Sequence, residues 1–289
     1  MTELPRVAMR KVSSGPLRGM VVVDSTLDHF LENDGDPNAL FQENATLLKS
    51  SRSTRSALVK LDPFRGDGES DRIYAKELRY KGVAHSLKPL FRKHRAQVMW
   101  QVSWHLLEHG ISVPQPQGYL LKRRGPFFLK GFFFAKVQQG CLTLDKLCDN
   151  LDLLIERFDS GGLLEVLARQ IAKMHDSKAT HGDLKWSNVL VQEETNELWF
   201  VDLDASRLYI EIPGPKEVAR DLARFVLSGL EAGVEEAIME KFLNEYAGYR
   251  KLSRKSIDGP TKRILKKLKD RHEKKYRDGY CRQKVRRSS

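Results

Sequence analysis

The residues with the clearest chemical potential are two aspartates and an asparagine that lie close together in the sequence. Asp183 ends the motif HGD, Asn188 comes five positions later, and Asp202 ends a second apolar run, WFVD. Transfer of the terminal phosphoryl group of ATP needs a carboxylate beside the acceptor hydroxyl and oxygen ligands that hold magnesium. Magnesium often takes only one or two oxygen ligands from the protein. The order therefore predicts Asp183 at the acceptor and Asn188 and Asp202 at the metal.

A lysine adds positive charge to the same loop. Lys185 lies two positions after Asp183, and a cation there could stabilise the charge that builds on the moving phosphoryl group. Each of these residues has an ordinary explanation when taken alone, because an aspartate in a turn usually hydrogen-bonds its own loop. The combination, with a strand, a turn and a strand between Asn188 and Asp202, is what indicates a catalytic site.

The wider sequence resembles a known family. HGDLKWSN followed by VLV resembles the catalytic loop of protein-kinase-like folds, and WFVDLD resembles their magnesium-binding strand end. Residues 45–250 are similar to the bacterial lipopolysaccharide kinase family, which phosphorylates 3-deoxy-manno-octulosonic acid (Kdo) or heptose in the inner core. The other supporting stretches are IYAKELRYKG, RAQVMWQVSWHLLEHGISVPQPQGYL and RDLARF.

The resemblance implies an α+β, two-lobed protein-kinase-like fold with a small β-rich N-lobe, a helical C-lobe and ATP in the cleft between them. The chain of 289 residues is long enough for two lobes. We expect four parts. They are an N-terminal extension with an accessory strand (1–44), a nucleotide-binding N-lobe (45–137), a helical C-lobe with the catalytic loop (138–250) and a basic tail (251–289).

Residues 45–61 alternate apolar and polar on both sides of a polar turn, which predicts a hairpin. By resemblance this hairpin covers the ATP phosphates, although the glycines usual there are absent. Ser51, Arg52 and Ser53 at its tip could bind phosphate through hydroxyl and guanidinium groups. An exposed polar hairpin tip explains the same residues equally well.

The predicted strand Arg72–Leu78 carries Lys76, which by resemblance grips the α- and β-phosphates. In protein kinases a glutamate on the following helix pairs with this lysine. This chain departs from that pattern, because no Asp or Glu lies between Leu78 and Leu107. The alternatives for orienting the ammonium are Gln97, Gln101, Glu77 and Glu108.

Strands are also predicted at 19–25, 117–122 and 128–137, the last ending at the position of the hinge between lobes. By resemblance, main-chain groups near Lys136 to Gln139, including those of Lys136 and Gln138, bind adenine. The triplet FFF before them is expected to pack in the core.

The expected C-lobe is mostly helical. Ser160 could cap a helix whose apolar face leads to the catalytic loop, and His175 and His181 are expected to be structural. Asp221, placed at the start of a later helix, either braces the catalytic loop, as the resemblance implies, or interacts with the helix dipole. Only eighteen positions separate Asp202 from Arg220, and no APE-like motif follows. That short segment favours a small-molecule or glycan acceptor over a protein.

The net charge of +12 is concentrated at one end. Residues 251–289 hold sixteen Lys and Arg against four Asp and Glu, and the rest of the chain is balanced. Such a tail is often simply solvated, but its field could attract an anionic membrane, a phosphorylated lipid acceptor or nucleic acid. A lipid-linked acceptor makes the membrane surface the preferred partner and nucleic acid the least favoured.

The sequence lacks the patterns that are typical of membrane-spanning proteins and of secreted, disulfide-linked proteins. The sequence has no apolar run of the roughly 18 residues that span a bilayer and no signal-peptide pattern, so we expect a cytoplasmic protein, peripheral at the inner membrane. Its three cysteines form no CxxC pair, so neither a zinc site nor a disulfide framework is indicated.

The sequence thus predicts an ATP- and Mg²⁺-dependent kinase that phosphorylates a Kdo or heptose hydroxyl of the lipopolysaccharide inner core. One alternative is a protein Ser/Thr kinase or another small-molecule kinase of the same fold. The other is a non-catalytic module that binds RNA or membrane through its basic tail.

Overall fold

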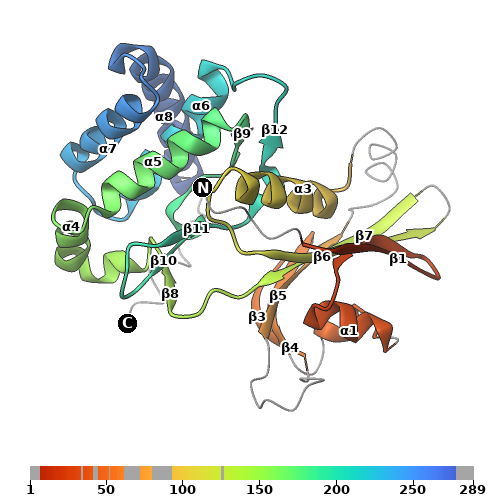
Figure 1. The fold of residues 1–289 in the computed structure, drawn as a ribbon. Coiled ribbons are helices and arrows are strands. Elements are labelled where there is room, and N and C mark those ends of the chain that lie inside the picture. Colours follow the sequence, from red (N-terminus) through yellow and green to blue (C-terminus); the bar gives the residue numbers. More distant parts are fainter. Residues whose placement is uncertain are drawn as a thin grey trace. The chain divides into compact units, whose positions relative to one another are not determined.

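The computed structural model describes residues 7–33, 35–41, 45–51, 53–61, 72–79, 93–124 and 127–277. The chain forms two compact units (Figure 1). Unit 1 comprises Met1–Gln139 with Leu203–Ser206, and unit 2 comprises Gly140–Asp202 with Arg207–Ser289. Two predictions fall outside the described residues, namely the one on Arg52 and the part of the basic tail at 278–289.

A seven-stranded antiparallel sheet organises unit 1. Its strand order is β1-β2-β6-β7-β5-β4-β3. The strands are β1 (Met9–Ser14), β2 (Leu17–Val22), β3 (Ala45–Ser50), β4 (Thr54–Lys60), β5 (Arg72–Arg79), β6 (Pro116–Arg124) and β7 (Phe127–Lys136). The predicted hairpin at 45–61 and the three later strands are confirmed. The strand predicted at 19–25 is shifted towards the N-terminus as β2, and its partner β1 was not predicted.

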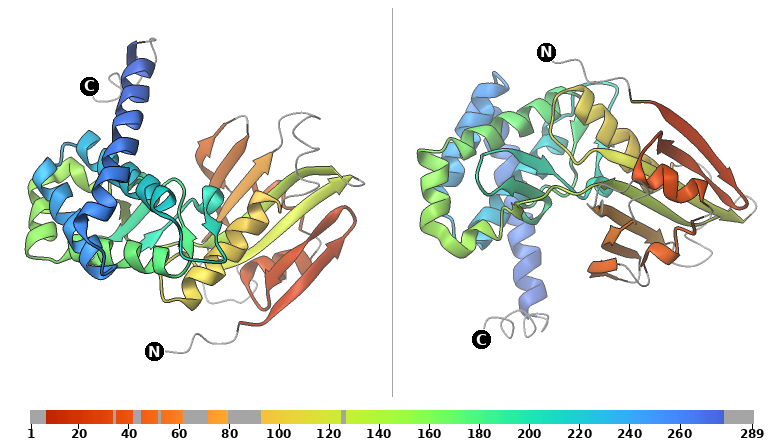
Figure 2. Two further views of the ribbon diagram at one scale, coloured as in Figure 1. Left: turned by 90° about the horizontal axis from the view of Figure 1, so that it is seen from above. Right: turned by 60° about the horizontal axis from the view of Figure 1, so that its bottom comes forward.

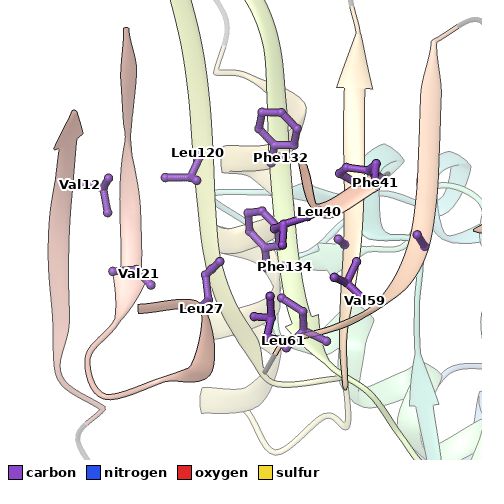
Figure 3. Packing of buried hydrophobic residues seen from close by; sticks show 13 residues of the cluster. Val12, Val21, Leu27, Leu40, Phe41, Val59, Leu61, Leu120, Phe132 and Phe134 are labelled. Carbon is purple, nitrogen blue, oxygen red and sulfur yellow. The ribbon is translucent and has the colours of Figure 1, made fainter. Parts of the chain in front are cut away.

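Alternating side chains of β7 build a core on each face of this sheet. Phe132 and Phe134 lie in a cluster with Leu120 and with residues of two short helical segments, α1 (Thr26–Glu32) and the 3₁₀ turn Ala39–Phe41 (Figure 3). Phe133 lies in a second cluster, together with residues of the helix α3 (Arg95–Glu108). The expectation that the FFF triplet packs in the core is therefore confirmed, and the reason is the period-2 alternation of a strand.

A buried histidine starts helix α3. The Nδ1 of His94 accepts a hydrogen bond from the Ala96 amide at 3.0 Å and so caps the helix. Its ring lies so close to Gly131 that a Cβ there would come within 2.2 Å of the ring carbon Cε1. Burial, followed by the charges of Arg95 and Arg123, lowers the pKa of His94 to about 4.

Five helices and two small sheets make up the described part of unit 2. The helices are α4 (Leu151–Asp159), α5 (Leu163–Asp176), α6 (Pro215–Glu231), α7 (Glu236–Tyr249) and α8 (Arg254–Arg277). The strands β8 (Cys141–Thr143), β10 (Val189–Gln192) and β11 (Leu198–Phe200) form one sheet, and β9 (Ala179–Thr180) pairs with β12 (Arg207–Leu208). Short 3₁₀ turns lie at Leu147–Asn150 and Trp186–Asn188. Helix α8 packs against α6, and its C-terminal part extends away from the other helices of this unit (Figure 2).

Two expectations about helix ends are wrong. Ser160 does not cap α5, because its hydroxyl donates to the Glu156 carbonyl at the end of α4 and Gly162 is the residue before α5. Asp221 is not at the start of its helix, since α6 begins earlier, at Pro215. Proline suits a first helical position because its missing N–H would be unpaired there anyway.

Helices in the described ranges lack the combination of length and apolar character that a membrane span requires.

The histidine cap makes the stability of unit 1 pH-dependent. Between pH 6.5 and about 4 the unfolded chain binds a proton at His94 that the folded chain does not bind, so stability falls as the pH falls through this window. The loss should reach about 3 kcal/mol. In urea unfolding series from pH 7 to pH 4.5, His94→Asn, which keeps a capping side chain, should flatten this dependence. The exposed His109→Asn at the other end of α3 is the control. An unchanged pH slope in His94→Asn would contradict the assignment.

Candidate active site

Three of the predicted site residues, Asp183, Lys185 and Asn188, lie in the loop between β9 and β10, and Asp202 lies close to them in the fold of the small sheet. Asn188 directly precedes β10 and Asp202 follows β11 after one intervening residue. The two strands are antiparallel, with Val189 opposite Phe200, and the Val201 amide donates to the Asn188 carbonyl at 3.0 Å. The ladder therefore places Asn188 and Asp202 at the same end of this small sheet.

The side chains at this end suit a hard cation. Asn188 is buried and its amide nitrogen donates to the main-chain oxygen of Asp183 at 2.9 Å, which leaves its amide oxygen for another partner. Asp202 has a backbone φ of 63°, a left-handed conformation that is uncommon outside glycine and often found at functional sites. No group of three His, Cys, Asp or Glu that could hold a metal occurs among the described residues. A magnesium ion on one amide and one carboxylate would thus take its remaining ligands from phosphate and water.

A buried carboxylate from α6 holds the loop. Asp221 is 0% exposed and accepts hydrogen bonds from the main-chain amides of His181 at 2.7 Å and Gly182 at 2.8 Å. The Nε2 of His175 lies 3.4 Å from the same carboxylate, and its Nδ1 lies 2.7 Å from the Tyr246 hydroxyl. Of the two roles considered for Asp221, the structure confirms that it braces the loop.

His181 and Gly182 are both adapted to this position. The His181 ring is buried and its Nε2 donates to the Val201 carbonyl at 3.0 Å, so the expected structural role is confirmed. Gly182 has a φ of 79°, which a residue with a Cβ adopts only with strain. In the HGD motif, His181 thus supports the loop through its ring, Gly182 permits a left-handed turn, and Asp183 follows that turn.

Asp183 lies between two cations. Its Oδ2 is 3.6 Å from the Nζ of Lys185, and its Oδ1 forms an ion pair with the guanidinium of Arg224. The carboxylate is partly exposed, so it remains open to an acceptor. Sequence reasoning missed Arg224, although a signal was available: Arg224 follows Asp221 by three positions on α6 and so shares its face of the helix.

In unit 1, Lys76 has an acidic partner that was not predicted. It is 5% exposed, and its Nζ donates to Oδ2 of Asp204 at 2.9 Å. Asp204 lies in the 3₁₀ turn Leu203–Ala205 and also pairs with Arg95, the first residue of α3. Asp204, two positions after the candidate metal ligand Asp202, thus contacts Lys76 in the way that the sequence led us to expect of a residue on or near the following helix.

Two of the alternatives for Lys76 are engaged elsewhere. The amide oxygen of Gln101 accepts from Lys93 at 2.9 Å. Glu77 neighbours Lys76 on β5 and therefore points to the opposite face, where it lies 3.0 Å from Lys130 and also bonds to Arg79. Burial would raise the pKa of Glu77, but the hydrogen bonds from Arg79 and Lys130 outweigh burial and lower it.

The predicted nucleotide contacts at the hairpin and hinge remain predictions. Ser51 is occupied within its own turn, since its hydroxyl accepts the amides of Thr54 at 3.1 Å and Ser53 at 3.3 Å. Arg52 lies outside the described residues. The Lys136 amide donates to the Gln115 carbonyl at 2.9 Å, so this donor is already used. Gln138 is partly buried after the end of β7.

Comparison with solved structures gives the class of the fold. The chain is similar to the solved structure of WaaP in complex with acyl carrier protein, with a TM-score of 0.60 and 18% sequence identity, over 82% of this chain and 95% of that one. The two share a mixed α/β fold, and this agrees with the kinase-like fold that the sequence predicts.

Sequence comparison then gives the family. A family model described as "Lipopolysaccharide kinase (Kdo/WaaP) family" matches residues 38–246. The 3-deoxy-D-manno-octulosonic acid kinase of Vibrio cholerae serotype O1 is 26% identical over 136 residues, which cover 43% of this chain. The aligned stretch spans about half of that relative, 54% of its length. The chain belongs to the lipopolysaccharide kinase (Kdo/WaaP) family, and the resemblance is confirmed.

The Lys76–Asp204 pair leads to a prediction about nucleotide binding. Asp204→Asn removes the charge that orients a nearly buried ammonium, so ATP binding should weaken by about tenfold or more. Isothermal titration with a non-hydrolysable ATP analogue measures this. Asp28→Asn is the matched control, because Asp28 is also buried in unit 1 and pairs with Arg10 rather than with Lys76. Wild-type affinity in Asp204→Asn would contradict the role.

The brace on the loop predicts a local loss of protection. Asp221→Ala leaves the amides of His181 and Gly182 without their acceptor, at a cost of about 1–3 kcal/mol each. Hydrogen exchange followed by mass spectrometry should show faster exchange in a peptide that spans these residues. Asp176→Ala, which removes a more exposed ion pair with Arg250 in the same unit, should leave that peptide unchanged. Equal exchange in Asp221→Ala and the wild type would refute the brace.

Proposed function

We propose that this chain is an ATP-dependent kinase that phosphorylates a hydroxyl of a Kdo sugar in the lipopolysaccharide inner core. The observation that carries the proposal is the arrangement at Asp183. A partly exposed carboxylate stands on a loop braced by Asp221, with Lys185 on one side and Arg224 on the other. This gives an acceptor hydroxyl a proton acceptor and gives the transferring group nearby positive charge.

In the proposed reaction, the acceptor oxygen attacks the γ-phosphorus of ATP. A new oxygen–phosphorus bond forms as the bond to the β,γ-bridging oxygen breaks, and ADP leaves with that electron pair. Asp183 positions the hydroxyl and takes its proton. Lys185 offsets the charge on the moving phosphoryl oxygens.

The remaining candidates hold the nucleotide. Lys76, oriented by Asp204, binds the α- and β-phosphates, and Asn188 and Asp202 provide oxygen ligands for magnesium. The bound ion would neutralise phosphate charge and fix the geometry of the triphosphate. In this assignment unit 1 is the β-rich N-lobe of a two-lobed kinase and unit 2 is the helical C-lobe.

Arg224 supports Kdo over heptose as the acceptor. Its Nε is buried and has no hydrogen-bond partner within the described ranges, and its guanidinium is partly exposed beside Asp183. A guanidinium matches a carboxylate through two parallel hydrogen bonds. Kdo is an acidic sugar, whereas a heptose offers only hydroxyls, so Arg224 would discriminate between them. A relative in the same family is named as a 3-deoxy-D-manno-octulosonic acid kinase.

The basic end of the chain supports a location at an anionic surface. Along α8, Lys255, Lys262 and Lys266 are exposed, as are several further cations of the tail. We therefore place the protein in the cytoplasm, peripheral at the inner membrane, with the lipid-linked sugar as its acceptor. A protein partner is a second candidate, because the similar WaaP structure is of a complex with acyl carrier protein.

Mass spectrometry of acceptors incubated with Mg-ATP tests the function. A Kdo-containing lipid A precursor should gain one phosphoryl group and a heptose-terminated acceptor should not. Asp183→Asn should lower turnover by about 100-fold or more. Near-normal turnover in that variant would refute the role of Asp183, and ATP hydrolysis without any phosphorylated sugar would refute the acceptor.

A second set of measurements tests Arg224. Arg224→Gln should raise KM for the Kdo acceptor by about tenfold or more and leave KM for ATP unchanged, since the variant loses positive charge beside Asp183 and the acceptor and not at the nucleotide. The exposed Arg169→Gln on α5 serves as the control. Equal KM values for the acceptor in Arg224→Gln and the wild type would remove the basis for preferring Kdo.

A further inference from the structure

An exposed aliphatic stripe begins in β12 of unit 2. Leu208, Ile210 and Ile212 are 43%, 92% and 55% exposed. They alternate with Tyr209 and Glu211 along a short segment that leaves the strand after Leu208 and bends at Ile210 and Glu211. Single exposed apolar residues are common on protein surfaces, but a contiguous group of them marks an interaction site.

The backbone of this segment is held so that the stripe points outward. Leu208 pairs with Ala179 in the β9–β12 ladder. The Tyr209 amide donates to the Lys178 carbonyl at 2.9 Å, and the Tyr209 hydroxyl lies 3.3 Å from that of Thr180. Tyr209 is therefore the residue that faces inward, and the isoleucines on either side of Glu211 are left in solvent.

The same ladder ties the stripe to the candidate catalytic loop. Strand β9 ends at Thr180, and His181, Gly182 and Asp183 follow directly. Three residues span at most about 11 Å. The antiparallel ladder pairs Arg207 with Thr180 and Leu208 with Ala179, so the segment begins beside this loop and continues away from it. The start of the stripe thus borders the part of unit 2 where the acceptor would be bound.

Cations flank the stripe. Arg207 precedes it and Lys216 follows it, both exposed, and Glu211 is the single acid from Arg207 to Lys216. Aliphatic side chains between exposed cations suit the boundary of an anionic bilayer, where apolar groups enter the acyl region and cations meet phosphates. A stripe of three side chains is small beside the roughly 800 Å² per partner of a stable protein interface, so a second copy of the chain is a poorer match.

We propose that the segment from Arg207 to Ile212 inserts Leu208, Ile210 and Ile212 into the surface of an anionic bilayer. The insertion holds the catalytic loop at the level of the lipid headgroups, where a lipid-linked sugar presents its hydroxyl. The value of this contact for catalysis rests on the proposed function, whereas the membrane contact itself does not.

Flotation with acceptor-free vesicles tests the contact directly. The vesicles contain phosphatidylglycerol and phosphatidylethanolamine, and the full-length protein is compared with the double variant Ile210→Ser and Ile212→Ser. The variant should bind at least about tenfold more weakly, because two aliphatic side chains no longer leave water. Leu153→Ser is the matched control, since Leu153 is 47% exposed on α4 in the same unit. It should bind like the wild type.

Three outcomes would overturn the proposal. The double variant could bind these vesicles as tightly as the wild type. It could be weakened only when the acceptor lipid is present, which would make the acceptor's acyl chains the occupant. It could change the sedimentation coefficient of the protein but not its vesicle binding, which would make a second copy the occupant.

Kinetics on two acceptors connect the contact to catalysis. For a lipid-linked Kdo acceptor in vesicles, the double variant should lose about tenfold or more in kcat/KM. For a soluble Kdo saccharide without acyl chains, it should match the wild type. Equal losses on both acceptors would overturn the membrane role. If the wild type phosphorylates neither acceptor, the proposed function fails, and the flotation result still decides the membrane contact.

Discussion

The buried carboxylate of Asp221 is the constraint on which the candidate site depends. A charge withdrawn from water is costly unless hydrogen bonds replace its hydration, and here two loop amides and the ring of His175 surround it. Satisfying this charge fixes the backbone of the HGD motif against α6. One turn further along the same helix, Arg224 reaches Asp183. A single helix thus sets both the position of the candidate catalytic carboxylate and the charge beside it.

A second buried charge imposes the corresponding constraint on unit 1. The ammonium of Lys76 also needs an acidic partner, and the helix that supplies one in protein kinases contains no acid before Glu108. Asp204 supplies it instead. The run VDLD consequently contains two aspartates with different positions: Asp202 is the candidate metal ligand in unit 2, and Asp204 is the partner of Lys76 in unit 1.

The sequence predicted what depends on local pattern and missed what depends on distant pairing. Alternation along 45–61 and 72–78 predicts strands because a strand with a buried face has a period of two residues. The order of Asp183, Asn188 and Asp202 predicts a candidate active site, because these residues follow one another along a loop and two strands that are neighbours in the sequence. Asp204 lies 128 positions from Lys76, and no periodicity reports such a contact. The misplaced start of α6 is a different kind of error, since Pro215 was a readable signal for a first helical position.

The short segment after Asp202 also bears on the class of acceptor. Arg220 follows Asp202 by only eighteen positions, and much of that length is committed. Asp204 pairs with Lys76, Tyr209 is tied to β9, and Pro215 starts α6. Little chain is left to line an extended peptide acceptor. What the segment does present is an aliphatic stripe between two cations, and such a surface suits contact with a bilayer, where a lipid-linked acceptor lies, better than it suits a peptide. The shortness of the segment between Asp202 and Arg220 therefore disfavours a protein acceptor and favours a glycolipid acceptor.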